Sequence, residues 1–213
     1  MPEAGISVVG RGSHGAPTDS DDDHEKRLKQ VHGKIDGALR SPGLTDARRN
    51  ESQNAIHVVL SRMTAAALAR LHANVKEYKF YPSQLALTIG VQAKYPQLKP
   101  KHGKMFKGMF DKDGDIHLNG RGDGKLFGLP ASLEEFQAHE LAHGIDGAAH
   151  EFSDSTPWRK AWKAEKDFFT HGKESQREGW AEFGQLLLGK GITRKQMKEA
   201  MPKCLRVWEA NGL

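Results

Sequence analysis

The sequence has little cysteine, no long apolar run and no hydrophobic segment near its N-terminus. Its 213 residues include one cysteine, Cys204, which excludes an intrachain disulfide and fits a reducing compartment. Cys204 lies in an apolar-periodic stretch, which favours a buried structural thiol over a nucleophile. Because no apolar run reaches membrane-spanning length and no signal-peptide core is present, we expect a soluble, cytoplasmic protein without a membrane partner.

Apolar residues are also sparse, since hydrophobic side chains make up only 37% of the chain. The first 24 residues have few of them, cannot bury enough surface to offset the entropy of ordering, and are predicted to form a disordered tail over 1–24. The net charge of +5 allows an anionic partner, but Lys and Arg are mixed with acidic residues in most windows. This mixture favours a solvated surface over a nucleic-acid face, although the segment after Lys190 is locally basic.

Helical periodicity dominates the first third of the chain. It predicts helices over 25–39 and 46–74, which together form a helical N-terminal segment over 25–74. The pattern then changes, and strands are predicted at 78–81 and 85–91 because both stretches are rich in β-forming residues.

The last third of the chain is again helical, and its helices have clear start signals. Ser132 with Glu135 has the spacing of a capping box, and the pattern predicts helices over 133–146, 157–169, 176–189 and 194–211, the last broken at Pro202. Helices, a small central sheet and more helices predict an α+β fold, with the sheet and its flanking helices forming one domain over 75–213.

A hairpin is predicted over 105–119, and its turn carries Asp111, Asp113 and Asp115 in the alternation of a calcium loop. An EF-hand loop needs Gly at its sixth position and Glu at its twelfth. Here Gly114 stands fourth and Gly122 stands twelfth, so the pattern predicts a plain turn.

The strongest chemical signal is His139-Glu140-Leu141-Ala142-His143, in the middle of the predicted 133–146 helix. Residues four apart lie on one helix face, so both imidazoles can reach one ion. A catalytic Zn²⁺ site uses three protein ligands and leaves a position for water. Glu140 can take a proton from the zinc-bound water and pass it to the leaving amine, which predicts a zinc-dependent hydrolase. The alternative is two histidines on a solvated helix face.

A third ligand is required, and Glu178 and Glu182 are the candidates. They are four residues apart, while Trp180 and Phe183 would pack the other side of their helix onto the core. Glu178 could instead complete a capping box with Ser175, and Glu182 could be a surface charge. Spacing alone does not choose between them.

The two motifs together, residues 139–146 and 178–183 (Glu-Gly-Trp-Ala-Glu-Phe), resemble the gluzincin zinc metallopeptidases. Within them the chain is most similar to the anthrax-lethal-factor-like catalytic domain of phage head-morphogenesis proteins and polymorphic toxins. The resemblance spans about 75–190 and implies a zincin-like fold and cleavage of a protein or peptide substrate. It also implies that the protein could act in a virion or inside a host cell.

The resemblance also implies roles for single residues. It makes Glu178 the third zinc ligand and Glu182 an acidic group that orients a ligand histidine. Asp146 shares the histidine face and is a weaker candidate for the same orienting role. The strand at 115–119 would run beside the cleft and pair with extended substrate.

One position departs from the family pattern. A tyrosine often stands seven residues before the ligand glutamate, where it polarises the scissile carbonyl, but this sequence has His171. A histidine can donate a hydrogen bond to an oxyanion, so His171 is a catalytic candidate. The alternative is an exposed loop histidine.

Two other functions compete with this one. A regulator-cleaving peptidase of the ImmA/IrrE type also pairs the His-Glu-x-x-His motif with a later Glu, but the sequence shows no convincing helix-turn-helix beside it. A non-catalytic, zinc-stabilised structural or virion protein is supported only by the basic C-terminal segment. Zinc content without cleavage of a casein-like or partner protein would favour that second alternative.

Overall fold

The computed structural model describes five stretches of the chain, residues 21–40, 43–99, 105–120, 125–126 and 129–213. Most of the predicted disordered tail, residues 1–20, lies outside them. Residues 21–24, predicted as part of that tail, begin helix α1 (Asp21–Leu39). The helix starts earlier than predicted because three aspartates lie in its first turn, where carboxylates stabilise the amide end of a helix.

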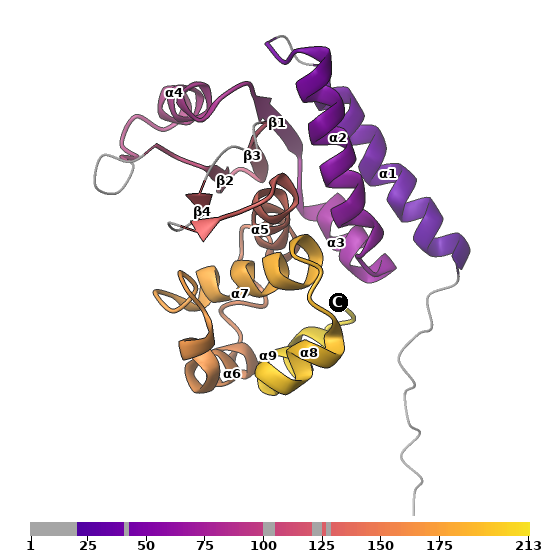
Figure 1. Cartoon of the computed structure of the whole chain (residues 1–213), viewed down its shortest axis with the longest axis vertical. Coiled ribbons are helices and arrows are strands. Elements are labelled where there is room, and N and C mark those ends of the chain that lie inside the picture. Colours follow the sequence, from indigo (N-terminus) through magenta and orange to yellow (C-terminus); the bar gives the residue numbers. More distant parts are fainter. Residues whose placement is uncertain (1–20, 41–42, 100–104, 121–124, 127–128) are drawn as a thin grey trace, which may run out of the picture.

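The single helix predicted over 46–74 is two helices, α2 (Asp46–Ser61) and α3 (Ala65–Asn74). Thr64 separates them, because its backbone is extended and its hydroxyl accepts a hydrogen bond from the Ala67 amide at 3.1 Å. A threonine in this position caps the start of a new helix. Helices α1, α2 and α3 lie together beside the sheet (Figure 1).

The main sheet has three strands in the order β1-β3-β2. β1 (Glu77–Tyr81) pairs in parallel with β3 (Asp115–Asn119), and β2 (Gly108–Phe110) pairs antiparallel with β3, as the hairpin predicted. β3 is therefore the central strand, with both edges paired. The prediction that 115–119 pairs with substrate is wrong for this reason, and β1 and β2 are the two edge strands. A separate two-stranded ribbon joins β4 (Lys125–Leu126) to β5 (Leu129–Pro130).

The strand predicted at 85–91 is also wrong, since the chain forms helix α4 (Gln84–Lys94) there. Ser83 caps the helix by accepting a hydrogen bond from its first turn. Leu87 and Val91, four residues apart, are fully buried on one face, which packs over the sheet on the side away from α1–α3 (Figure 1). Tertiary packing of that face overrides the β preference of the individual residues.

Helix α5 (Leu133–Asp146) lies in the middle of the molecule, between the sheet with its N-terminal helices and the C-terminal helices (Figure 1). It contacts α2, α3, β2 and β3 as well as the C-terminal layer. Ser132 and Glu135 form the predicted capping box at its start. The C-terminal layer consists of α6 (Thr156–Glu165), the 3₁₀ turn η2 (Lys166–Phe168), α7 (Gln176–Gly184), the π-helical turn η3 (Gln185–Gly189), α8 (Arg194–Ala200) and α9 (Pro202–Ala210).

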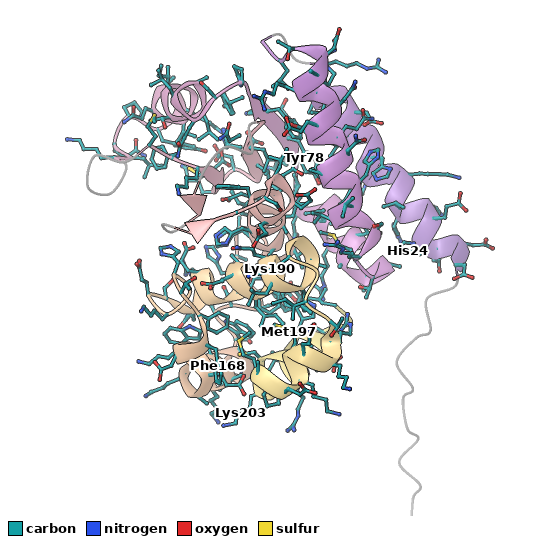
Figure 2. The ribbon with its side chains drawn as sticks, in the orientation of Figure 1. His24, Tyr78, Phe168, Lys190, Met197 and Lys203 are labelled. Carbon is teal, nitrogen blue, oxygen red and sulfur yellow. The ribbon has the colours of Figure 1, made fainter. Side chains whose placement is uncertain are left out.

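The C-terminal layer is held by buried aromatic side chains. Trp158, Trp180, Phe183 and Trp208 are in contact and are almost completely buried. Met197 lies among these helices, whereas Lys203 projects from their outer side (Figure 2).

Two properties of the chain follow from these elements. Cys204 is fully buried, as predicted, and burial raises the pKa of its thiol. The helices and small mixed sheet confirm the α+β class. None of the helices in the described part of the chain combines the length and the apolar character of a membrane span.

Helix α4 makes a direct prediction about stability. In a strand Leu85 and Leu87 would share one face, but in α4 Leu87 is buried and Leu85 is 57% exposed. We expect Leu87→Ala to lower the free energy of unfolding by about 2–5 kcal/mol, as for other buried leucines. The matched variant Leu85→Ala should change it by no more than about 0.5 kcal/mol. Urea denaturation measures both, and equal losses would contradict the helix.

Candidate metal centre

Helix α5 brings the two histidines of the motif together. His139 is 3% exposed, the His143 side chain is 14% exposed, and their rings meet edge to face with centroids 5.2 Å apart. Both side chains lie on the face of α5 that meets α7. The motif is therefore in the interior and not on a solvated helix face.

Glu178, on the first turn of α7, meets these histidines. Its Oε2 atom lies 3.3 Å from His139 Nε2 and 3.9 Å from His143 Nε2. Ser175 caps α7 by accepting a hydrogen bond from the Glu178 amide, but the Glu178 carboxylate faces the histidines instead of closing a capping box. Between the two glutamates that spacing left open, it is Glu178 that lies against the imidazoles.

The three side chains fit a zinc ion. Their donor atoms all lie within 4.8 Å of one another. Four ligands around zinc with bonds of about 2.0–2.1 Å have donor atoms roughly 3.3 Å apart, close to the spacings seen here. Burial lowers the pKa of His143 to about 3, so this imidazole is neutral, as a metal ligand must be. Burial opposes the charge of Glu178, but hydrogen bonds with His139 and His171 hold its pKa below the usual range, so an anionic oxygen completes the set.

Glu140 lies beside this donor set, on the side of the edge strand β2. Burial raises the pKa of Glu140 to about 7, Glu178 adds to the increase, and His139 and a hydrogen bond from the Phe110 amide oppose it. A carboxylate with such a pKa suits general-base chemistry near neutral pH. A Cβ atom at Gly108 would lie 2.5 Å from Glu140 Cγ and Oε1, so the carboxyl group has its place only because residue 108 is glycine.

His171 is at the centre and is not an exposed loop residue. Its Nε2 atom lies 3.4 Å from Glu178 Oε2, and its Nδ1 atom lies 3.2 Å from Glu174 Oε1. The side chain is 20% exposed, so it is accessible to a ligand while held between two carboxylates.

Glu182 and Asp146 make different contacts from those predicted. The Glu182 carboxylate accepts four hydrogen bonds from residues 170–172, the loop that carries His171. The Asp146 carboxylate accepts hydrogen bonds from residues 152–153, which fold back after α5. Both carboxylates therefore fix loops around the centre, and the role of orienting a ligand histidine stays a prediction.

Three residues at the centre were missed by sequence reasoning. Glu174 stands three residues after His171, and Gln185 stands seven residues after Glu178. Burial lowers the pKa of His139, but Glu178, Glu140 and Gln185 together raise it above the usual value. Glu174 lies in the same turn as His171, ahead of α7, so helical spacing gives no signal for it, whereas Gln185 continues the helical stretch two turns after Glu178. Gly108 had none, because its role depends on β2 lying against α5.

A second cluster, Asp111, Asp115 and His117, also has three donor atoms within 4.8 Å. It already contains cationic partners. Lys94 Nζ lies 2.7 Å from Asp111 Oδ2 and 2.8 Å from Asp115 Oδ2, and Lys79 Nζ lies 2.6 Å from Asp115 Oδ2. The Asp111 carboxylate also accepts hydrogen bonds from backbone amides of its own turn, as predicted for a plain turn. This cluster is an ion-pair network that fastens α4 to the sheet.

Comparison with known proteins identifies the fold. No protein-family model matches the chain, and no curated protein matches it. Among solved structures, the Pro-Pro endopeptidase PPEP-2 from Paenibacillus alvei matches with a TM-score of 0.60 and 18% sequence identity. The match covers 83% of this chain and 99% of that chain, so the two share an α+β fold over nearly the whole of PPEP-2.

The geometry predicts one metal ion per chain. Zinc reconstitution followed by native mass spectrometry should show a single zinc ion, which is lost in His139→Ala and in Glu178→Ala because each removes one of three ligands. The control Asp111→Asn alters the second cluster and should keep the ion. Zinc loss in Asp111→Asn, with a normal zinc content in Glu178→Ala, would place the metal at the Asp111 cluster and contradict the assignment to His139, His143 and Glu178.

Proposed function

We propose that this protein is a zinc-dependent endopeptidase of the gluzincin type, with His139, His143 and Glu178 as the ligands. The observation that carries the proposal is the convergence of these three donors, with Glu140 beside them, in an α+β fold shared with an endopeptidase. The resemblance of the two motifs to the lethal-factor-like domain supports the same assignment. The donor set of two imidazoles and one carboxylate is one that catalytic zinc uses in hydrolases.

The chemistry divides between the ion and the side chains around it. A bound zinc ion supplies a Lewis acid and acidifies a water molecule. Glu140 accepts the proton of the attacking water and delivers it to the leaving amine, which its raised pKa allows. His171 donates a hydrogen bond to the carbonyl oxygen of the scissile bond as negative charge develops there.

We propose a protein or peptide as the substrate. Strand β2 is at the edge of its sheet and borders Glu140, so an extended peptide can add to that edge by backbone hydrogen bonds. The Pro-Pro preference in the name of PPEP-2 is a property of that protein. Casein and a peptide mixture that includes Pro-Pro sequences together test the substrate without presuming this preference.

Glu140→Gln separates catalysis from metal binding. The amide is nearly isosteric but cannot accept a proton, so we expect zinc to be retained and casein cleavage to fall by about 10²–10⁴-fold. Cleavage is measured at matched zinc occupancy, with His139→Ala as the metal-free control. Full activity of Glu140→Gln would rule out Glu140 as the general base. Zinc binding by a wild-type protein that cleaves none of the substrates would favour the structural alternative.

Gly108→Ala tests whether β2 sets the position of the base. The added Cβ would overlap the Glu140 side chain, so we expect cleavage to fall by about 10²-fold, as for a displacement of roughly 1 Å at a reacting group. Zinc content should not change. The matched control is Gly33→Ala in α1, where a Cβ meets nothing within 4 Å and activity should be preserved. Equal activities of the two variants would show that Glu140 does not depend on β2.

A further inference from the structure

The loop that carries His171 is held by one buried carboxylate. Glu182 is 4% exposed, and its Oε1 atom accepts hydrogen bonds from the amide and hydroxyl of Thr170 at 2.8 and 2.6 Å. Its Oε2 atom accepts from the amides of His171 and Gly172 at 2.9 and 2.6 Å. Short hydrogen bonds to an ionised carboxylate are roughly twice as strong as neutral ones, so this loop has a firm attachment.

The same loop also packs tightly against α7. A Cβ atom on Gly172 would lie 2.7 Å from Gly179 Cα, so the two backbones meet at a distance that only glycine allows. The Trp162 indole donates a hydrogen bond to the Gly172 carbonyl at 2.7 Å. The backbone on both sides of His171 is therefore fixed to the helix that carries Glu178.

This attachment decides where the His171 ring lies. Glu178 and Glu182 are one turn apart on α7, so a single helix holds both the candidate metal ligand and the loop. The ring then lies between Glu174 and Glu178, with Nε2 towards the donor set. Burying a carboxylate is unfavourable unless its oxygens are hydrogen-bonded, and the four hydrogen bonds that Glu182 accepts all come from this loop.

We infer that Glu182 is a positioning residue. It holds His171 so that Nε2 can donate a hydrogen bond to the carbonyl oxygen of a bound peptide. The inference rests on the proposed function for its chemistry, because His171 must touch the substrate. A purely structural role of Glu182 predicts a different result. Substituting Glu182 would then lower stability, and its effect on kcat would be the same with or without the His171 side chain.

The test is a double-mutant cycle between Glu182 and His171. Glu182→Gln keeps the size of the side chain but turns an NH₂ group towards donors. We expect kcat on casein to fall by about tenfold, with little change in KM, while His171→Ala alone lowers it by about 10²-fold. The double variant should be no slower than His171→Ala. The inference would be overturned if Glu182→Gln lowered kcat by the same tenfold in the His171→Ala background. It would also be overturned if Glu182→Gln did not lower kcat in the wild-type background.

Two further variants test whether the loss of kcat comes from general destabilisation. Glu165 is a second buried carboxylate, at the end of α6, and it accepts hydrogen bonds from the Lys203 and Cys204 amides at the start of α9, both at 2.9 Å. Glu165→Gln should lower the melting temperature without lowering kcat. If Glu182→Gln does not fold, Thr170→Val removes only the hydroxyl contact, and its loss of kcat must likewise vanish in the His171→Ala background.

A binding measurement distinguishes failure of this inference from failure of the proposed function. Acetohydroxamate titrated into the cobalt(II)-substituted protein is followed by visible absorption, which needs no turnover. Glu182→Gln and His171→Ala should weaken its affinity, and the double variant should be no weaker than His171→Ala. If wild type does not cleave casein but this pattern holds, the proposed activity fails and the positioning role stands. Independent losses in the two variants would overturn the positioning role, as would a protein that binds no cobalt.

Discussion

The packing of α7 against α5 brings Glu178 against the two histidines of the candidate metal centre. Trp180 makes this contact, since its indole donates a hydrogen bond at 3.0 Å to the Ala142 carbonyl inside the histidine helix. The ring is completely buried among Phe152, Trp158 and Trp208. Because a helix turns by about 100° per residue, fixing Trp180 in the core turns Glu178 to the side, where the histidines lie. A large apolar residue thus fixes the direction of a charged one.

Buried carboxylates then fasten the loops around that contact. Asp146, Glu165 and Glu182 each accept hydrogen bonds from backbone amides distant in sequence, at residues 152–153, 203–204 and 170–172. A carboxylate can accept several bonds at once, so a single side chain can satisfy a run of amides that no helix or strand pairs. The Glu165 contact also lies at the N-terminus of α9, where a negative charge is favourable.

The two clusters of possible metal donors differ in how their negative charge is balanced. Around Asp111 the balance comes from Lys94, whose ammonium lies between Asp111 and Asp115 and joins α4 to the sheet, and from Lys79 of β1, which pairs with Asp115. Around Glu178, burial raises the pKa of the carboxylate, but the imidazoles of His139, His171 and His143 lower it below the usual value. Imidazole nitrogen with one carboxylate oxygen is a set that binds zinc, whereas an ammonium between two carboxylates already occupies the place of a cation.

The sequence by itself determined the histidine pair and its helix, because a spacing of four residues and a capping box are local properties that tertiary packing did not alter. It also determined the β2–β3 hairpin and the break at Pro202 for the same reason. Tertiary structure alone decided that 84–94 is a helix, since burial of Leu87 and Val91 outweighed local preference. Spacing left Glu178 and Glu182 equivalent, and only the tertiary structure shows that Glu178 faces the two histidines while Glu182 faces residues 170–172. Neither the place of Glu140 against Gly108 nor the attachment of the His171 loop was local, because both depend on elements that meet only when the chain is folded.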